Sequence, residues 1–267
     1  MKLSISNIAW DAYQDDAVYT LMKKYSYIGL EIAPTRILPE APYDKIGAAE
    51  KWSKELKNNW GFTVSSLQSI WYGRQEKIFG KNEERQFLIN YTKKAIDFAA
   101  AVGCGNLVFG CPRNRNLPEG ADAYVAIAFF RELGDYAAAK GTVIGMEANP
   151  TIYNTNYINS TKSAIDLIRQ VNSKGFLLNL DVGTIIQNGE DVAELINNVH
   201  LINHVHISEP GLKPIEKKSL HQKLKKILID ENYGGFISIE MAKVDEISVI
   251  VSALKYLGSI FAEGSEG

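Results

Sequence analysis

The sequence predicts an α/β protein folded as a closed (β/α)8 barrel, the TIM barrel, and three observations support this prediction. Short apolar runs, typical of strands buried on both faces, alternate with longer amphipathic stretches typical of helices. The alternation repeats eight times over 267 residues, and such a barrel needs roughly 250. Four of the later runs end on Glu147, Asp181, His206 or Glu240, at an average spacing of 31 residues, about one βα unit. We expect one barrel domain over residues 1–267.

The first half of the chain contains four expected strands and four expected helices. The strands are 2–8, 27–32, 63–67 and 106–109, and the helices are 14–25, 45–59, 82–102 and 124–140. Gly61 is expected to end the second helix, because glycine tolerates the left-handed cap conformation. Asn82 is expected to cap the third, with Glu83 and Glu84 stabilised by the helix dipole in its first turn.

The second half continues the alternation and carries the polar strand ends. The expected strands are 143–147, 176–181, a strand around 205–206, and 236–240; the helices are 161–171, 191–199, 220–231 and 245–261. The tail, 262–267, is expected to be frayed. Because the carboxyl ends of parallel strands carry the active sites of such barrels, we expect the four polar strand ends to meet there.

The composition excludes several functional classes. The formal net charge of -2 does not provide the excess positive charge that binding to nucleic acid or to an anionic membrane requires. No apolar run approaches the roughly 20 residues of a membrane span, and the chain begins as a strand without the apolar region of a signal peptide. Cys104 and Cys111 are too few for a disulfide framework. We expect a cytoplasmic protein.

Electrostatic repulsion argues that the polar strand ends bind a cation. Three ionised carboxylates about 5 Å apart repel by about 3 kcal/mol per pair at an effective dielectric near 20. The three pairs together approach the whole stability of a domain, about 5–15 kcal/mol. Any one of these acids alone could equally cap a helix or pair with a lysine at the rim. Four of them at matched strand ends favour a divalent metal site.

The ligand set indicates the metal and the chemistry. Oxygen-rich ligation by three carboxylates and one imidazole suits Mn²⁺, Mg²⁺ or Co²⁺, with Zn²⁺ as an alternative. An octahedral ion held by four protein ligands has two positions open for a carbonyl and its neighbouring hydroxyl, which would polarise the carbonyl and acidify the adjacent C–H. Glu147 and Glu240 could then remove and return a proton on opposite faces of that carbon. This is epimerisation or aldose–ketose isomerisation through an enediolate.

The strand-end motifs resemble those of the sugar phosphate isomerase/epimerase family, the xylose isomerase-like TIM barrels that include AP endonuclease family 2. The motifs are Met146-Glu147-Ala148-Asn149-Pro150, Leu180-Asp181-Val182-Gly183, Val205-His206-Ile207-Ser208-Glu209 and Ser238-Ile239-Glu240-Met241. The resemblance covers nearly the whole chain. It implies one divalent metal on Glu147, Asp181, His206 and Glu240, the two glutamates as acid and base, a small carbohydrate substrate, and a homo-oligomer.

The chain departs from two members of that family. Ketose 3-epimerases usually carry a substrate-binding histidine three residues after the aspartate ligand, where this chain has Thr184, and an arginine after the histidine ligand, where it offers Lys213 and further lysines. Endonuclease IV needs additional histidines for a trinuclear site, whereas strand three here ends in Gln68. A ketohexose 3-epimerase of the usual kind and a DNA-repair enzyme are therefore not expected.

Further residues near strand ends are candidate substrate contacts. They are Glu31, Gln68, Trp71, Asn149, Glu209, Lys213 and His221. All but Lys213 have a structural alternative: Glu31 and Gln68 as core or rim polar groups, Asn149 and Glu209 as ordinary loop hydrogen-bonding residues, Trp71 and the neighbouring Tyr72 as loop packing, and His221 as a solvated residue at a helix start. Arg113 and Arg115 could bind a phosphate or be solvated charges.

Three functions remain open from the sequence. The leading hypothesis is a metal-dependent isomerase or epimerase of a small sugar, polyol or sugar phosphate. The alternatives are a lyase that removes water from a cyclic polyol, and a barrel that binds a sugar or a metal without turnover. Only the lyase yields a product lighter by water, and only the non-catalytic barrel fails to exchange a carbon-bound proton with solvent.

Overall fold

Short strands pair in parallel, each with its successor along the chain, and the last pairs with the first, so the sheet closes into a barrel. The computed structural model describes residues 1–262, so most of the tail predicted to be frayed lies outside the described residues. Within them the strands are β1 (Lys2–Ser6), β2 (Gly29–Ile32), β3 (Thr63–Leu67), β4 (Leu107–Phe109), β5 (Ile144–Met146), β6 (Phe176–Asp181), β7 (Ile202–Ile207) and β8 (Phe236–Ile239). The predicted barrel is confirmed.

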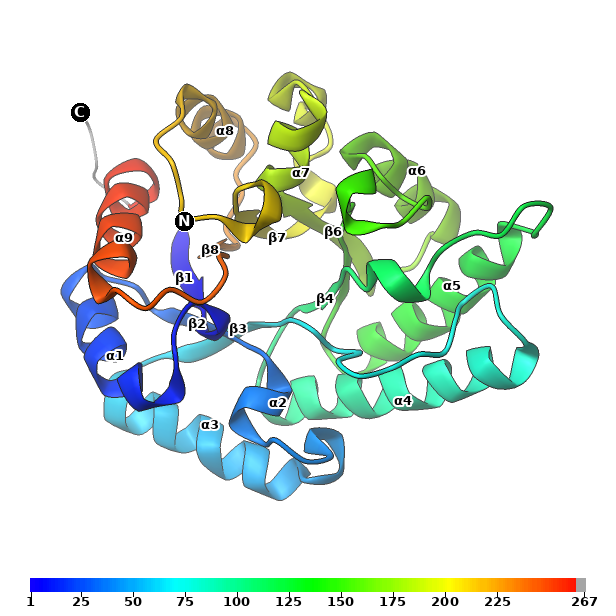
Figure 1. The fold of residues 1–267 in the computed structure, drawn as a ribbon, viewed down its shortest axis with the longest axis horizontal. Coiled ribbons are helices and arrows are strands. Elements are labelled where there is room, and N and C mark those ends of the chain that lie inside the picture. Colours follow the sequence, from blue (N-terminus) through cyan, green and yellow to red (C-terminus); the bar gives the residue numbers. More distant parts are fainter. Residues whose placement is uncertain (263–267) are drawn as a thin grey trace.

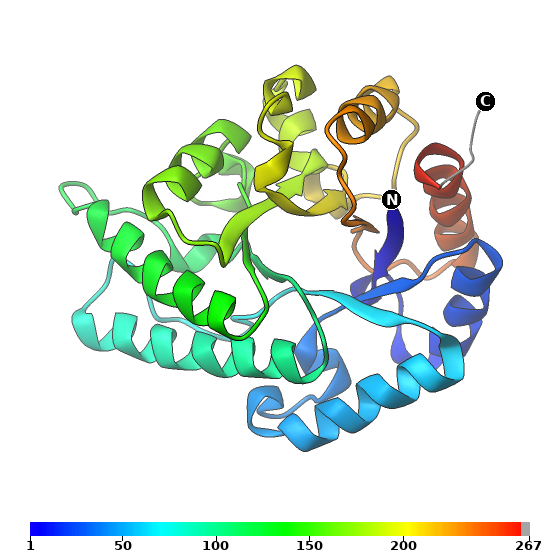
Figure 2. The ribbon, with the colours of Figure 1, turned by 180° about the vertical axis from the view of Figure 1, so that it is seen from behind.

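Helices surround this barrel, with α9 packed beside α1 so that the outer ring also closes (Figures 1 and 2). The helices are α1 (Asp15–Lys24), α2 (Pro34–Ile37), α3 (Ile46–Trp60), α4 (Asn82–Ala101), α5 (Tyr124–Ala139), α6 (Thr161–Val171), α7 (Val182–Asn188), α8 (Ser219–Asp230) and α9 (Ile247–Phe261). Among the described residues no helix is long and apolar enough to cross a membrane.

The inside of the barrel is polar, and the apolar core lies between the strands and the helices. In β1, Leu3 and Ile5 join the apolar core, while the hydroxyl of Ser4 reaches across to Ser65, 2.6 Å away in β3. Since β1 and β3 are not neighbours in the sheet, this contact crosses the interior. Other buried polar residues hydrogen-bond there as well, including Asn106 with Asn179 at 3.3 Å. The strands are buried on both faces as predicted, but one face is hydrophilic.

Two local predictions were wrong, and helix capping explains both. The sequence predicted a helix over 191–199, but the helix of this unit is α7, which starts directly after β6 because the carboxylate of Asp181 accepts hydrogen bonds from its first backbone N–H groups. Only short 3-10 turns occur at Val192–Leu195 and Val199–Leu201. Asn82 is the first residue of α4 and not its cap; the preceding N–H, of Lys81, donates to Glu84 at 2.9 Å.

We predict that Gly175→Ala is destabilising while Gly47→Ala is not. A Cβ at Gly175, before β6, would lie 2.1 Å from the backbone oxygen of Gly134, whereas one at Gly47 in α3 meets nothing within 4 Å. The first change should lower the unfolding free energy by roughly 1–3 kcal/mol through overpacking. The second should leave it unchanged or raise it by about 0.5–1 kcal/mol. Urea denaturation measures both, and equal stabilities for the two variants would contradict the packing.

Candidate metal centre

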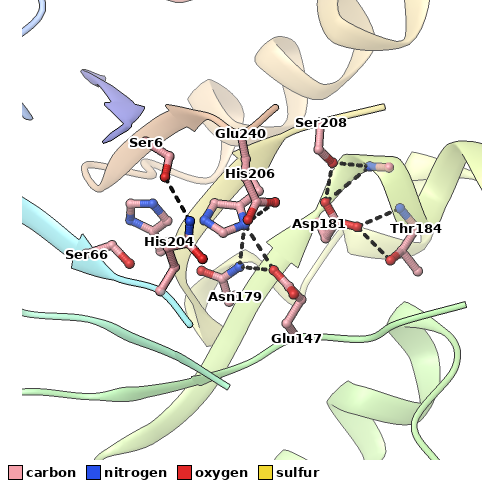
Figure 3. Close-up of polar contacts among 12 residues, drawn as sticks. Ser6, Ser66, Glu147, Asn179, Asp181, Thr184, His204, His206, Ser208 and Glu240 are labelled. Atoms are coloured by element: carbon pink, nitrogen blue, oxygen red, sulfur yellow. Dashed lines mark hydrogen bonds and ion pairs between the residues drawn. The ribbon is translucent and has the colours of Figure 1, made fainter. Parts of the chain in front are cut away.

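The four predicted ligands converge at the carboxyl ends of neighbouring strands. Glu147 follows β5, Asp181 ends β6, His206 is the penultimate residue of β7, and Glu240 follows β8. One donor atom from each lies within 4.8 Å of the donors of the other three. Figure 3 shows Glu147 and Glu240 directed at the same edge of the His206 ring. The structure therefore brings together the residues that the sequence selected; their role as ligands stays a prediction.

His206 lies between carboxylates on both edges of its ring. Its Nδ1 is 3.0 Å from Glu147 Oε1 and 3.2 Å from Glu240 Oε2, and its Nε2 is 2.7 Å from Glu31 Oε2. Neither His206 nor Glu31 is exposed to solvent. Burial disfavours the imidazolium, but the three carboxylates outweigh this effect and hold the pKa of His206 well above its ordinary value. Negative charge is thus concentrated where a cation would be held.

Asp181 is the most constrained of the four. Its Oδ2 accepts hydrogen bonds from the backbone N–H of Thr184 at 2.8 Å and from the Thr184 hydroxyl at 2.7 Å. Its Oδ1 accepts from the Ser208 hydroxyl and, at 3.3 Å, from the N–H of Gly183. Burial raises the pKa of Asp181, and the nearby Glu147 carboxylate raises it further.

Amides and a buried arginine orient Glu147. Asn179 donates to Glu147 Oε1 at 2.9 Å and Asn149 donates to Oε2 at 3.2 Å. Arg115 is fully buried and donates to the backbone oxygen of Glu147 at 2.8 Å and to Asn149 Oδ1 at 2.9 Å. Both sequence interpretations of Arg115, a phosphate ligand and a solvated charge, were wrong. It fixes the loop that positions the carboxylate.

The donor set fits a divalent ion. With bonds of about 2.1 Å, as for Mg²⁺, two donors on opposite sides of an ion lie about 4.2 Å apart, and the four donor atoms here all lie within 4.8 Å of one another. The donors are three carboxylates and one imidazole nitrogen, which suits Mn²⁺, Mg²⁺ or Co²⁺. Gly110 supplies the space, because a Cβ there would lie 2.8 Å from Glu147 Oε2. These residues can hold one divalent cation without rearrangement of the strands.

A second group of metal-ligand type, Glu31, His204 and His206, lies deeper in the barrel and shares His206 with the first. His204 Nε2 is 3.4 Å from the same Glu31 oxygen that contacts His206. Burial opposes ionisation of Glu31, but His206 and His204 outweigh it and lower the pKa of Glu31 below its ordinary value. The contacts of Glu31 with His204 and His206 hold these three side chains in this arrangement. A carboxylate behind the imidazole fixes the ring orientation and tautomer of a metal-binding histidine.

A cavity of about 190 Å³ opens above the four residues, and we call it the inner cavity. Its lining is Gln68, Ser69, Val108, Gly110, Cys111, Pro112, Glu147, Asn149, Tyr153, Asp181, Leu212 and Glu240. Of the candidate substrate contacts, Gln68 and Asn149 lie in this lining. Gln68 also donates to Ser6 at 3.2 Å, so its amide is held in place at the cavity floor.

The other substrate candidates lie outside the lining. Glu31 is sealed beneath His206, and the Trp71 indole is buried and donates to Thr92 at 2.8 Å. Glu209 is buried and pairs with Lys218 at 3.2 Å. Lys213 is exposed in the loop after β7.

His221 is not the solvated residue that the sequence suggested. It is fully buried, and its Nδ1 is 2.9 Å from the Tyr256 hydroxyl on α9. It also lies outside the inner cavity lining. Burial and the ammonium of Lys218 lower the pKa of His221 to about 4. Its role is to join α8 to α9.

Two residues that hold the centre, Asn179 and Ser208, were not predicted from the sequence as site residues, and a third, Arg115, was predicted in other roles. Asn179 had a signal, because it is a polar residue inside the apolar run of β6 and lies two positions before Asp181, on the same face of the strand. Ser208 follows His206 by two residues in the same way. The structural role of Arg115 could not be predicted from its own segment, because the residues to which it donates hydrogen bonds lie 32 to 43 positions away in the sequence.

Comparison with known proteins supports the architecture. The family described as xylose isomerase-like TIM barrel matches residues 20–260 of this chain. No curated protein matches the sequence.

Solved structures with similar folds include two sugar epimerases. The 3-keto-D-glucoside 4-epimerase of E. coli is 18% identical with a TM-score of 0.75, over 97% of this chain and 98% of that one. The D-psicose 3-epimerase of Clostridium cellulolyticum H10 is 16% identical with a TM-score of 0.73, over 100% and 93%. An AP endonuclease, family 2, from Brucella melitensis is 20% identical with a TM-score of 0.71, over 96% and 97%. At these identities the likeness shows the fold.

We predict that Glu31→Gln weakens Mn²⁺ binding by about 10- to 100-fold, because it removes the charge behind the imidazole while keeping its shape. Calorimetric titration of the metal-free protein with MnCl₂ measures this directly. Glu55→Gln, an exposed change on α3, is the control and should bind Mn²⁺ as the parent does. Unchanged affinity in a cooperatively folded Glu31→Gln protein would refute the positioning role.

We predict that His221 lowers stability at acidic pH. The unfolded histidine takes up its proton near pH 6.5 and the folded one only near pH 4, so the unfolded chain binds more protons between these values. The unfolding free energy should therefore fall as pH decreases across this window, by up to about 3 kcal/mol. His221→Gln should flatten the dependence, whereas the exposed control His200→Gln should not. Denaturation curves from pH 4 to 7 compare them, and parallel curves for all three proteins would contradict the assignment.

Proposed function

This chain belongs to the xylose isomerase-like TIM barrel family, and from that premise we propose that it is a divalent-metal-dependent isomerase or epimerase of a small carbohydrate. The observation that carries the proposal is the placement of Glu147 and Glu240. Both carboxylates contact His206 Nδ1, at 3.0 and 3.2 Å, and both line the inner cavity. With two carboxylates beside one cation site, one can remove a proton from a carbon next to a carbonyl and the other can return one.

The cation would be held by Glu147, Asp181, His206 and Glu240, and when bound it would polarise a sugar carbonyl and its neighbouring hydroxyl. The ligands would then have different roles. Asp181, fixed by four hydrogen bonds, is a positioning ligand. Glu147 and Glu240 each keep part of their carboxylate exposed, 10% and 12% of the side chain, to remove the proton at carbon and to return one.

The surroundings of the two glutamates differ. Both oxygens of Glu147 accept amide hydrogen bonds, from Asn179 and Asn149, which fix the direction of its carboxylate. Burial raises the pKa of Glu240, and the adjacent His206 opposes that rise. Either carboxylate could act as the base in one direction of the reaction and as the acid in the other.

The comparisons support a carbohydrate substrate at the level of class. Two of the similar structures are sugar epimerases, a 3-keto-D-glucoside 4-epimerase and a D-psicose 3-epimerase. Thr184 stands where ketose 3-epimerases usually carry a substrate-binding histidine, and its hydroxyl lies 2.7 Å from Asp181 Oδ2 and 2.8 Å from the backbone oxygen of Ala148, which share its one hydrogen, so this hydroxyl is committed to the fold. The substrate contacts of this chain must therefore differ from those of the usual ketohexose 3-epimerases.

We predict that Glu240→Gln keeps the fold and part of the Mn²⁺ affinity but lowers proton exchange at carbon by at least about 100-fold, since an amide cannot transfer the proton. The measurement is deuterium incorporation from D₂O into a panel of ketoses and aldoses, followed by NMR. Glu55→Gln is the control and should exchange at the parent rate. Parent-level exchange in Glu240→Gln would rule out its acid/base role.

The same panel separates the competing functions. Recovered sugar that carries deuterium at the carbon beside the carbonyl, with mass otherwise unchanged, supports isomerisation or epimerisation. A product lighter by water would indicate the lyase. An absence of exchange across the panel with Mn²⁺ bound would indicate a binding barrel and overturn the proposal.

A further inference from the structure

A second, larger hollow adjoins the inner cavity, and we call it the outer cavity. Its volume is about 540 Å³, and its lining is Ser69, Trp71, Tyr72, Gly73, Arg74, Gln75, Cys111, Pro112, Arg113 and Asn114. Ser69, Cys111 and Pro112 belong to both linings. The two hollows therefore adjoin, with these three residues at their boundary; the carboxylates of the candidate metal centre line the inner one and Tyr72 lines the outer one.

We propose that the outer cavity is a subsite for a second sugar unit, so that the substrate is a keto sugar bearing a glycosyl substituent and not a free monosaccharide. The proposal rests on the function proposed above and names its substrate class. In it, the sugar that reacts occupies the inner cavity, and the glycosyl unit lies between the loop after β3 and the loop after β4.

The walls of the outer cavity are fixed before any ligand arrives. The two loops are joined by hydrogen bonds from the Ile78 N–H to the Asn114 oxygen at 2.9 Å, and from the Asn114 amide to the backbone oxygens of Arg74 and Glu76 at 3.2 and 2.8 Å. Lys77 Nζ donates to the backbone oxygen of Arg113 at 2.5 Å. A hollow held by cross-loop bonds is a preformed site, which small-molecule pockets usually are.

The backbone at the junction of the two cavities is unusual. Ser69 and Cys111, one from each loop, have φ of 54° and 44°, in the left-handed region that non-glycine residues seldom adopt. The Ser69 hydroxyl hydrogen-bonds to Gln68, which itself lines the inner cavity. Such conformations are concentrated at ligand sites, where the surrounding structure holds them. Here they lie at the boundary between the two cavities.

The chemistry of the outer wall fits a sugar ring. Tyr72 is 70% exposed, and within residues 1–262 its ring has no aromatic partner, so its face is free to stack on the C–H face of a sugar. Arg74 is held with its guanidinium 5.2 Å from the Tyr91 ring centre, and Arg113 and Gln75 are exposed at the rim. These side chains are planar hydrogen-bond donors for hydroxyl groups.

The division of charge between the cavities favours this substrate. The inner lining contains three carboxylates and no lysine or arginine, so its net charge stays negative even with one divalent cation bound, which disfavours an anionic group on the reacting sugar. In the outer cavity the arginines could attract either hydroxyls or an anion. The exposed Tyr72 ring favours a sugar, because an anion gains little from an aromatic face, whose own charge is negative.

Binding to the Mn²⁺-loaded full-length protein tests the proposal. Calorimetry would compare D-fructose with the neutral disaccharides turanose, lactulose and palatinose, which carry a second sugar on different fructose carbons, and with D-fructose 6-phosphate. We expect at least one disaccharide to bind about tenfold tighter than fructose. Tyr72→Ala should lower the affinity for that disaccharide by about five- to tenfold and leave fructose affinity unchanged. Tyr124→Ala, which removes a ring 74% exposed on α5 outside both linings, is the control and should change neither.

Three results would overturn the proposal. They are no disaccharide binding above that of fructose, an equal loss of fructose and disaccharide affinity in Tyr72→Ala, or a preference for fructose 6-phosphate that Arg113→Gln abolishes. The last would identify an anion subsite. Deuterium exchange separates this test from the proposed function: exchange into monosaccharides without a disaccharide preference refutes only the subsite, and a disaccharide preference without exchange refutes only the isomerase.

Discussion

The placement of one imidazole between buried carboxylates determines the rest of the site. His206 receives Glu147 and Glu240 on one edge and Glu31 on the other, and none of these charges could be buried singly without a large desolvation cost. The arrangement is stable only if positive charge stays among the acids, as a proton on the ring or as a cation beside it. This requirement links the strand ends, the buried Glu31 and the open cavity into one electrostatic unit.

The barrel accommodates such a unit because its interior is hydrophilic. Most apolar residues pack between the strands and the helices, where they stabilise the fold; Val108, which lines the inner cavity, is an exception. Serines and asparagines inside the barrel, such as Ser66 and Asn106 with 2.9 Å between them, satisfy one another and support the charged groups above. A deep, buried carboxylate such as Glu31 is tolerated here because its neighbours are polar.

Most of the fold and the central part of the site follow from the sequence, because both depend on features local to each strand. Parallel strands of similar length place their last residues together, so the spacing of Glu147, Asp181, His206 and Glu240 predicted their convergence. Long-range partners could not be predicted in this way. Arg115 and His221 are buried by segments distant in the chain, and the 3.6-residue pattern of a helix does not reveal which neighbouring helix covers a residue. The helix at 191–199 was misplaced because Asp181 was considered only as a ligand and not also as a helix cap.

In this barrel the hydrophilic lumen sets the electrostatic field at His206, and the outer apolar layer stabilises the fold. Most protein cores combine these two tasks. Substituting a serine or asparagine inside this barrel alters the field at His206 while leaving the outer apolar layer intact. A library at lumen positions such as Ser4, Ser66 and Ser238 would therefore sample reactivity without altering the apolar layer, provided that hydrogen-bonded partners are changed together, because a lost hydroxyl leaves a buried partner unsatisfied.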